Sequence, residues 1–417
     1  MKSISSRLVS VVLNVSILST IFGTTSLAQA NITVTNLADS GPGSLRQAIA
    51  DAAPGETVKF AVTGTITLTT GQLVVDKPLT IIGPGSKHLK ISGNNACRVF
   101  HTRSFPVTIS ALTITDGRAF NYGYPDSNVG GGIYNIGDLV LTDCIITNCT
   151  CTNYGSGIFT MDHSLTMSGC AVIGNSGGGG ALWIDTNGAA NSVNCTFSGN
   201  SCYGVYNYQG YVVLKNCTIT SNSGGISQEA VSLTIQNTIC ADNFGWDCLA
   251  VAIAPIVSND YNLIGTSHGF PITGATQHNI YGHPPLLGPL ADLGGPTPTH
   301  ALRFDSPALD AGSSSGLSTD QRGFSRPIDS PDVANAEGGD GSDIGAYEVN
   351  PLTQMAIFTA IEVEFGTTLG RTYRVESSTD MVTWTQVEAG IVGTGGPLTR
   401  LYTTRAIPKR FFQAVQE

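Results

Sequence analysis

The chain has 417 residues and a formal net charge of −10; charged residues make up 12% of it, and 50 residues are glycine. This charged share is about half the usual one, which leaves few side chains for the surfaces of helices and favours short strands joined by tight turns. Nucleic-acid binding needs a basic face, so the charge argues against a nucleic-acid partner.

The first 30 residues have the three parts of a cleavable secretory signal. Lys2 and Arg7 precede an apolar stretch at 8–22, and the small-residue sequence Ala28-Gln29-Ala30 follows it. We therefore expect residues 1–30 to be removed on export and the mature chain to be extracellular or attached to a cell surface. No later stretch reaches about 18 consecutive apolar residues, so we predict no transmembrane segment after cleavage.

The amino-terminal segment of the mature chain contains a short predicted helix. Ser44, within SGPGSLRQAI (40–49), is placed to cap this helix before a strand at 58–60. Because an open solenoid exposes unpaired strand edges, both of its ends need cover. We expect the apolar face of the helix to close the first coil.

Residues 31–288 contain a repeat in which one cysteine marks each copy. An apolar residue and any residue precede Asn, Asp or Gly, then come Cys, any residue and an apolar residue, as in MSGCAV (167–172); Asn usually follows three positions later. Copies are 21 to 26 residues apart, which suits one coil of a solenoid each. The marker positions are Cys144, Cys170, Cys195, Cys217 and, in the last copy, Thr238. We predict an all-β fold, a right-handed parallel β-helix.

The residue types in this pattern have physical causes. A sharp bend between two short strands needs a residue that tolerates left-handed backbone angles, and Asn, Asp and Gly do so most readily. Alternation along a strand then turns the Cys and the apolar residue two positions later to the same side. We expect the four marker cysteines to stack as buried free thiols rather than to form disulfides. A disulfide between Cys240 and Cys248 stays open.

Asparagines occupy a second fixed position. Asn175, Asn200, Asn222 and Asn243 each end a copy of the pattern, so stacking predicts a column of amides that hydrogen bond along the helix. The Asn-Cys-Thr triplets at 148, 194 and 216 match glycosylation sequons. We interpret them as corner residues of the coils.

A second pattern supplies another strand of each coil, with copies that start at Gly132, Gly157, Gly180, Gly204 and Gly225. Gly-Gly-Ile followed by Phe-x-x-Asn, as in residues 130–133 and 197–200, resembles the repeat pair of the polymorphic outer membrane proteins and related secreted β-helix proteins. The amino-terminal segment, with NITVTN at 31–36, also resembles theirs. The resemblance implies a surface or extracellular protein, often adhesive.

From residue 289 the composition changes to Pro, Asp and Gly. The segments PLADLGGPTPTHAL (289–302), SPALDAG (306–312), DQRG (320–323) and DIGAYE (343–348) resemble, in this order, the choice-of-anchor Q domain found after bacterial β-helices. We assign residues 289–350 to this carboxyl-terminal segment of the helix. The resemblance implies a surface or secreted location and no particular reaction.

The charged residues of this segment allow two interpretations. Arg322 and Arg326 lie among carboxylates, which favours an internal network of bidentate salt bridges; these carboxylates are Asp310, Asp320, Asp343 and Glu348. The alternative is a calcium site, because a Gly-rich loop supplies the hard oxygen ligands that calcium prefers; its residues are Asp332, Glu337, Asp340 and Asp343. Their spacing matches no EF-hand loop, so we predict no cofactor.

Residues 351–417 form a third unit with strand-like runs at 355–365, 373–377, 383–387 and 411–415. The sequence YRVESSTDMVTW (373–384) resembles small carboxyl-terminal β-sandwich modules of secreted multidomain proteins. We expect Trp384 to lie in the core of this module.

Parallel β-helices commonly act on polysaccharides, so lyase and hydrolase activities come into question. A lyase of uronic-acid polymers needs cationic groups, and Lys215 is the only Lys or Arg between Arg118 and Arg303, so elimination is disfavoured. Glycoside hydrolysis needs two carboxylates, and Asp162 and Asp185 hold the same offset in neighbouring copies. Both aspartates also end strands before turns, where Asp is common.

We therefore predict a non-enzymatic, monomeric protein that binds an extracellular glycan or a cell-surface component. Trp183 and Tyr208 are the candidates to stack on sugar rings. A polysaccharide-active hydrolase that uses Asp162 and Asp185 is the alternative.

Overall fold

The computed structural model describes residues 31–120, 128–251, 254–350, 360–403 and 411–416. The predicted secretory signal at 1–30 lies outside them. The chain divides into two compact units, with the boundary along the sequence between Val349 and Asn350. Within the described ranges, no helix combines the length and apolar character of a membrane span.

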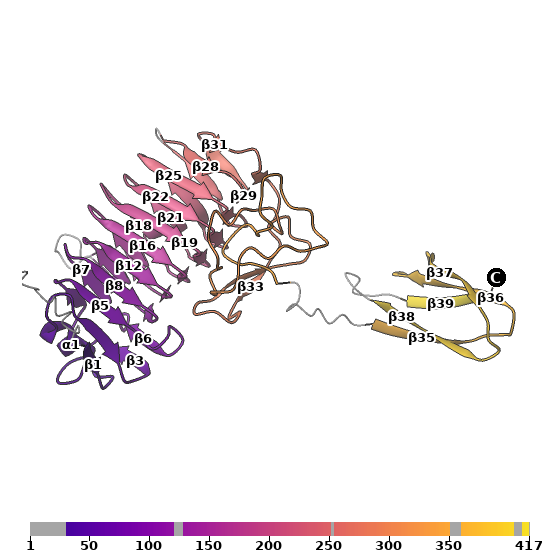
Figure 1. Ribbon diagram of the computed structural model, residues 1–417, viewed down its shortest axis with the longest axis horizontal. Helices are drawn as coiled ribbons and strands as arrows, with labels where there is room; N and C mark the ends of the chain where they lie inside the picture. Colours follow the sequence, from indigo (N-terminus) through magenta and orange to yellow (C-terminus); the bar gives the residue numbers. More distant parts are fainter. Residues whose placement is uncertain (1–30, 121–127, 252–253, 351–359, 404–410, 417) are drawn as a thin grey trace, which may run out of the picture. The chain divides into compact units, whose positions relative to one another are not determined.

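Three long parallel sheets build the first unit, and they make it the predicted right-handed parallel β-helix (Figure 1). We call the three sheets A, B and C. Each coil contributes one strand to sheet C, the next to sheet A and the next to sheet B, as β11 (Ile133–Asn135), β12 (Leu139–Thr142) and β13 (Ile145–Thr147) do. Corresponding strands of successive coils pair in parallel, so equivalent side chains lie over one another.

Sheet A contains β1 (Asn31–Val34), β2 (Thr57–Phe60), β5 (Leu79–Ile82), β8 (Val107–Ser110), β12 (Leu139–Thr142), β16 (Ser164–Ser168), β19 (Ala189–Val193), β22 (Tyr211–Lys215), β25 (Ser232–Gln236), β28 (Ile256–Asn259) and β31 (Thr273–Ala275). Sheet B contains β3 (Gly64–Thr67), β6 (Leu89–Ser92), β9 (Thr113–Thr115), β13 (Ile145–Thr147), β17 (Ala171–Ile173), β20 (Thr196–Ser198), β23 (Thr218–Thr220), β26 (Ile239–Cys240), β29 (Leu263–Ile264) and β32 (Ile280–Tyr281). Sheet C contains β4 (Leu73–Val75), β7 (Phe100–Thr102), β11 (Ile133–Asn135), β15 (Ile158–Thr160), β18 (Gly180–Ile184), β21 (Tyr203–Asn207), β24 (Gly224–Gln228), β27 (Cys248–Ala250) and β30 (Ser267–Gly269). A short parallel pair, β10 (Arg118–Ala119) and β14 (Thr150–Cys151), lies outside these sheets.

The corners between sheets A and B have the predicted left-handed backbone. Asp143, Asn194 and Asn216 have φ angles of 53°, 51° and 50°. Asn148, the third predicted corner asparagine, has a φ of 52°. The interpretation of the sequons as corner residues is therefore confirmed.

The four marker cysteines stack in the core as free, buried thiols, as predicted. The backbone ladder runs through them, since the residue after each of the last three donates its N–H to the carbonyl of the preceding marker cysteine; Thr196 donates to Cys170 at 2.9 Å and Thr218 to Cys195 at 2.9 Å. Cys240 and Cys248 are also buried free thiols.

The amino end is closed by α1 (Leu45–Asp51). Ser44 caps it, because its hydroxyl accepts the N–H of Gln47 at 3.2 Å. Leu45 and Ile49 pack into the core of the first coils, so the predicted cap is confirmed.

Residues 287–349, which we call the wrap, do not continue the coils at the carboxyl end. They contain one antiparallel pair, β33 (Leu287–Ala291) with β34 (Thr299–Leu302), and pack along the outer face of sheet B (Figure 1). β31 is the last strand of sheet A, and its three residues are exposed. The wrap therefore lies along one side of the helix, and β31 stays exposed.

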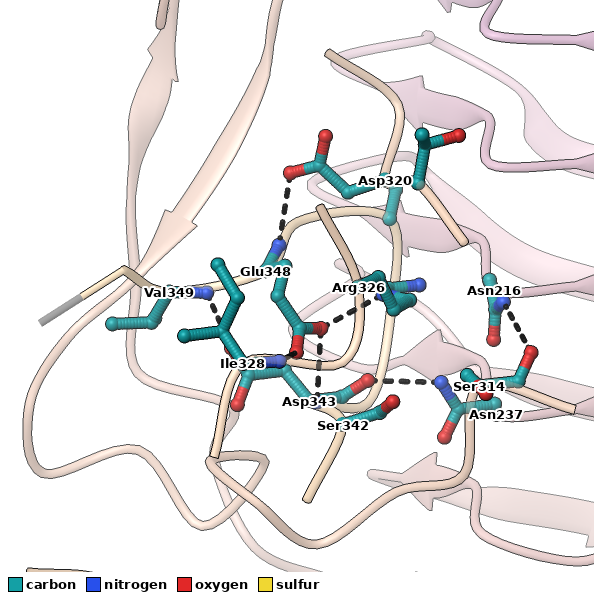
Figure 2. Close-up of polar contacts among 12 residues, drawn as sticks. Asn216, Asn237, Ser314, Asp320, Arg326, Ile328, Ser342, Asp343, Glu348 and Val349 are labelled. Atoms are coloured by element: carbon teal, nitrogen blue, oxygen red, sulfur yellow. Dashed lines mark hydrogen bonds and ion pairs between the residues drawn. The ribbon is translucent and has the colours of Figure 1, made fainter. Parts of the chain in front are cut away.

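Corner asparagines dock the wrap. The amides of Asn194 and Asn216 donate to the carbonyls of Thr319 and Ser314, at 2.9 and 3.4 Å. Asn237 donates in the same way to Asp343 at 2.9 Å, and Figure 2 shows this contact beside that of Asn216. The corner residue thus serves both the bend and the wrap, because Asn tolerates the left-handed angles and also carries a donor.

The second unit has two small antiparallel sheets, as predicted for a small β-sandwich module. One pairs β35 (Ala360–Gly366) with β38 (Pro397–Thr403), and the other has the order β37 (Thr385–Val392), β36 (Thr372–Ser378), β39 (Phe411–Gln416). Its core is formed by Tyr373, Val375 and Ile391, and the half-buried Trp384 is not part of it. The prediction for Trp384 is wrong because this residue lies in the turn between β36 and β37 rather than on a strand.

Candidate functional site

The three faces of the helix differ in what covers them. On sheet B, the outward hydroxyl of Thr196 hydrogen bonds to Thr299 and Gln321 of the wrap, at 2.8 and 2.6 Å. Ser198 contacts His300 at 2.8 Å, and both are buried. The wrap therefore covers sheet B at β20.

Outward side chains of sheet A are of mixed polarity. The register places Thr108, Val140, Thr166 and Asn191 in one column. Tyr211 and Val213 of β22 are 60% and 42% exposed on the same sheet.

Sheet C carries a column of aromatic rings. The register aligns Tyr134, Phe159, Trp183 and Tyr206 on successive strands. Trp183 and Tyr206 stack with ring centroids 4.1 Å apart and an interplanar angle of 12°. Rings at strand spacing stack this way because aromatic pairs favour offset parallel contact.

Two exposed tyrosines flank this stack. The ring of Tyr154 lies 4.3 Å from that of Trp183, and Tyr208 lies 6.0 Å from it on the next coil. Tyr154 is 42% exposed and Tyr208 37%, whereas Trp183 is 5% exposed. We call Tyr154, Trp183, Tyr206 and Tyr208 the aromatic patch; its accessible rings are the two flanking tyrosines.

The sequence identified Trp183 and Tyr208 but missed Tyr154 and Tyr206. Tyr206 follows from the register of sheet C, which pairs it with Trp183. The Gly pattern instead aligns Tyr206 with Leu182, so it did not mark Tyr206. Tyr154 lies in the turn after β14, outside both repeats, and pairs with Val129 of another turn through a single bridge. No periodic signal marks such a position.

Carboxylates hold the polar ends of these rings. The indole N–H of Trp183 donates to Oδ2 of Asp185 at 3.0 Å, and Thr186 donates to Oδ1 from its backbone at 2.7 Å. The hydroxyl of Tyr206 donates to Oε1 of Glu229. Burial, together with Glu229, raises the pKa of Tyr206 above its ordinary value. These bonds fix the ring orientations, as expected for a site that is organised before a ligand binds.

Asp162 and Asp185 do not share an offset, contrary to the sequence alignment. Ile158 is in register with Leu182, and the N–H of Gly157 donates to Ala181, so the copy at Gly180 is shifted by one residue. Asp185 therefore lies opposite Met161. The exposed Asp162 accepts instead from Asn187 at 3.3 Å. The matching inward residues, rather than the glycines, determine the register.

No lysine or arginine lies in the sequence around the aromatic patch. Lys215, the only one between residues 119 and 302, donates from Nζ to the carbonyl of Ser315 in the wrap at 2.8 Å. Arg98, from an earlier coil, lies 4.8 Å from the ring centroid of Tyr134, at the start of the aromatic column.

The four proposed calcium ligands do not come together. Asp332, Glu337 and Asp340 are exposed, and Asp343 is buried. Both oxygens of Asp343 accept backbone N–H groups, from Asp310 at 2.9 Å and Val349 at 2.6 Å. Among the residues that the structure describes, no three His, Cys, Asp or Glu side chains are placed to hold a metal ion. These residues do not fit a calcium site.

The predicted ion pairs are present in the wrap, without bidentate geometry. Arg322 pairs with Asp320 at 2.6 Å, and Nε of the fully buried Arg326 donates to Oε2 of Glu348 at 2.8 Å (Figure 2). Burial, with Glu348 nearby, raises the pKa of Asp343 to about 8. This cluster is internal to the wrap. Because the side chains of Arg326 and Glu348 are fully buried, a ligand cannot reach them from the surface.

Comparisons with known proteins agree with the fold. A family model described as "Right handed beta helix region" matches residues 84–244. No curated protein matches the chain. The crystal structure of pectate lyase Pel9A is 14% identical to this chain, with a TM-score of 0.45. The match covers 78% of this chain and 98% of the pectate lyase chain. A structure named Geobacillus virus E2 - ORF18 is 13% identical, with a TM-score of 0.34, and covers 61% of this chain and 60% of that chain. At such identities these likenesses carry no functional information, and together with the three parallel sheets the family match identifies the chain as a parallel β-helix protein.

Proposed function

We propose that this protein binds a neutral glycan through the aromatic patch and acts in adhesion to a cell surface or extracellular polymer. One observation carries the proposal: Tyr154 and Tyr208 expose their rings next to Trp183, which stacks with Tyr206 on sheet C. Exposed, fixed aromatic faces match the apolar faces of sugar rings, and few of them are needed for specific binding.

The polar groups beside the patch favour a sugar. Asp162 is exposed, and the hydroxyl of Thr186 contacts the amide oxygen of Gln209 at 3.2 Å. Carboxylate and amide oxygens accept hydrogen bonds from sugar hydroxyls. An acidic glycan would bring its carboxylates beside those of Asp162 and Asp185, and repulsion between like charges therefore favours a neutral glycan.

A second exposed aromatic pair on the same sheet favours an extended ligand. Trp246 stacks on His268 of β30 with ring centroids 4.6 Å apart, and Trp246 is 44% exposed. Trp246 lies two residues before β27, and in sheet C β24 lies between β27 and β21, the strand of Tyr206. A chain of several sugar units along the helix axis reaches both aromatic groups. The secretory signal expected from the sequence agrees with a ligand outside the cell.

Substitution of the two exposed tyrosines tests the proposal. Binding of the purified protein to a glycan array, followed by calorimetry with the best neutral ligand, should weaken by about tenfold in Tyr154→Ala and in Tyr208→Ala. Tyr281→Ala is the matched control, because Tyr281 on β32 is 44% exposed and lies on sheet B. Equal affinity in all three variants, or no binding of any neutral glycan, would overturn the proposal.

A further inference from the structure

A pocket of about 430 Å³ lies where the corner between sheets A and B meets the wrap. Residues 83–88 form one wall, and Asp143 and Pro296 contribute to the others. Ser86 donates its hydroxyl to the carbonyl of Pro296, and Lys87 pairs with Asp292 at 2.6 Å, so the loop is fastened to the wrap. The volume is within the usual range for small-molecule sites.

Asp143 departs from the pattern that docks the wrap elsewhere. It holds the same left-handed corner as Asn194 and Asn216, which donate amide hydrogens to wrap carbonyls. An ionised carboxylate has no hydrogen to donate. The wrap presents Pro296 here, which lacks an N–H that Asp143 might accept. The hydrogen bond that joins the later corners to the wrap is therefore missing at Asp143, and the pocket lies where it would be.

The Asp143 carboxylate has no hydrogen-bond donor among the described residues. It lies over Gly169 of the next coil, where an added Cβ would meet Oδ1 at 2.4 Å, so glycine leaves room for it. Burial raises its pKa to about 6, with a smaller contribution from Cys170 beneath it. The other charged or titratable groups of the pocket are Lys87, already paired with Asp292, and the exposed His88.

We propose that this pocket binds a small ligand that carries a protonated primary amine, of about the size of one amino sugar, and that the ammonium group donates to Asp143. A half-buried carboxylate without a partner is stabilised most by a ligand that brings both hydrogen-bond donors and positive charge. A metal ion is disfavoured, since the described residues place no three metal-binding side chains together. The proposal is independent of the aromatic patch on sheet C.

Glucosamine and glucose make a matched pair of probes, because they differ by an ammonium group in place of a hydroxyl. Calorimetry at pH 7 should show glucosamine binding to the unmodified chain about tenfold more tightly than glucose. Asp143→Asn should remove that preference. Asp116→Asn is the matched control, since Asp116 is also a partly buried aspartate with a positive φ, of 52°, but lies outside the pocket and already accepts from the Ser92 hydroxyl at 3.0 Å. Equal binding of the two sugars, or a preference that survives in Asp143→Asn, overturns the proposal.

A pH series on the unmodified chain tests the same carboxylate without a substitution. Between pH 7 and pH 5 most Asp143 carboxylates in the free protein take up a proton, so glucosamine affinity should fall by about tenfold. An affinity that does not change over this range contradicts the proposed contact. This test needs no variant, so it still decides the question if Asp143→Asn fails to show a cooperative thermal transition.

Discussion

The side-chain amide of Asn222 donates to Oδ1 of Asn243 at 2.9 Å, and the same oxygen accepts the backbone N–H of Asn222 at 2.9 Å. Asn175 and Asn200 repeat this double contact, each with the asparagine of the next coil. The column ends at Asp247, whose Oδ1 accepts both from Asn243 at 2.7 and 2.9 Å. A carboxylate suits this last place because it only accepts, and every amide before it must donate onward.

Asn200→Ala should destabilise the helix strongly. The Asn200 side chain accepts from the backbone and the amide of Asn175 and donates to the carbonyl of Val172 at 3.0 Å, all in the buried core. Loss of it leaves several buried groups unpaired, so we expect the free energy of unfolding to drop by about 3 kcal/mol. Urea unfolding followed by circular dichroism measures this. Thr166→Ala, on the open face of sheet A, should change it by less than about 0.5 kcal/mol; an equal effect of both contradicts the role of the column.

Cys97 should be the first thiol to react in the folded protein. It is partly exposed, whereas the other nine cysteines are buried. Burial raises the pKa of Cys97, so its reaction with a thiol reagent at pH 8 should be slow but still faster than that of the core column. Counting labelled thiols by mass spectrometry should give one in the native protein and ten in urea. Cys97→Ser should give none in the native protein; several labelled thiols in that variant would show that the column is not closed.

Stability should fall as the pH rises from about 5 to 8. Burial raises the pKa of Asp343 to about 8 from an ordinary 3.8, so in this range the folded chain holds a proton that the unfolded chain has lost. The stabilisation is complete below the unfolded pKa and is lost as pH rises through that of the folded state. Asp343→Asn should flatten this dependence in thermal unfolding measured across the range. A slope unchanged by the substitution would assign it to other groups, such as Asp310, whose pKa burial raises to about 6.

The repeat made most of the helix predictable, because one physical rule, stacking of equivalent side chains, governs it. Cys170 and Asn200 mark their coils by residue type alone. The sequence alignment of the coils misplaced Asp185 because it matched Gly180 with Gly157. In the structure the inward-facing Ile158 and Leu182 are paired instead. Contacts between segments that are far apart in the chain could not be predicted from the sequence. Asn194 meets Thr319 across 125 residues, and no local pattern contains such a pairing.

The geometry argues against hydrolysis by Asp162 and Asp185. Asp185 is held by Trp183 and Thr186, and Asp162 by Asn187, so the two carboxylates have different partners and are not in register. Glycoside hydrolysis needs two carboxyl groups on opposite sides of one bond.

We therefore expect the unmodified chain to release no reducing ends from neutral polysaccharides, and Asp162→Asn to bind the same glycan within about twofold of it, because an exposed rim hydrogen bond contributes little. Reducing-end release that both Asp162→Asn and Asp185→Asn abolish would establish the hydrolase instead. Release that persists in both variants would place the chemistry elsewhere on the helix and leave the aromatic patch as its binding surface.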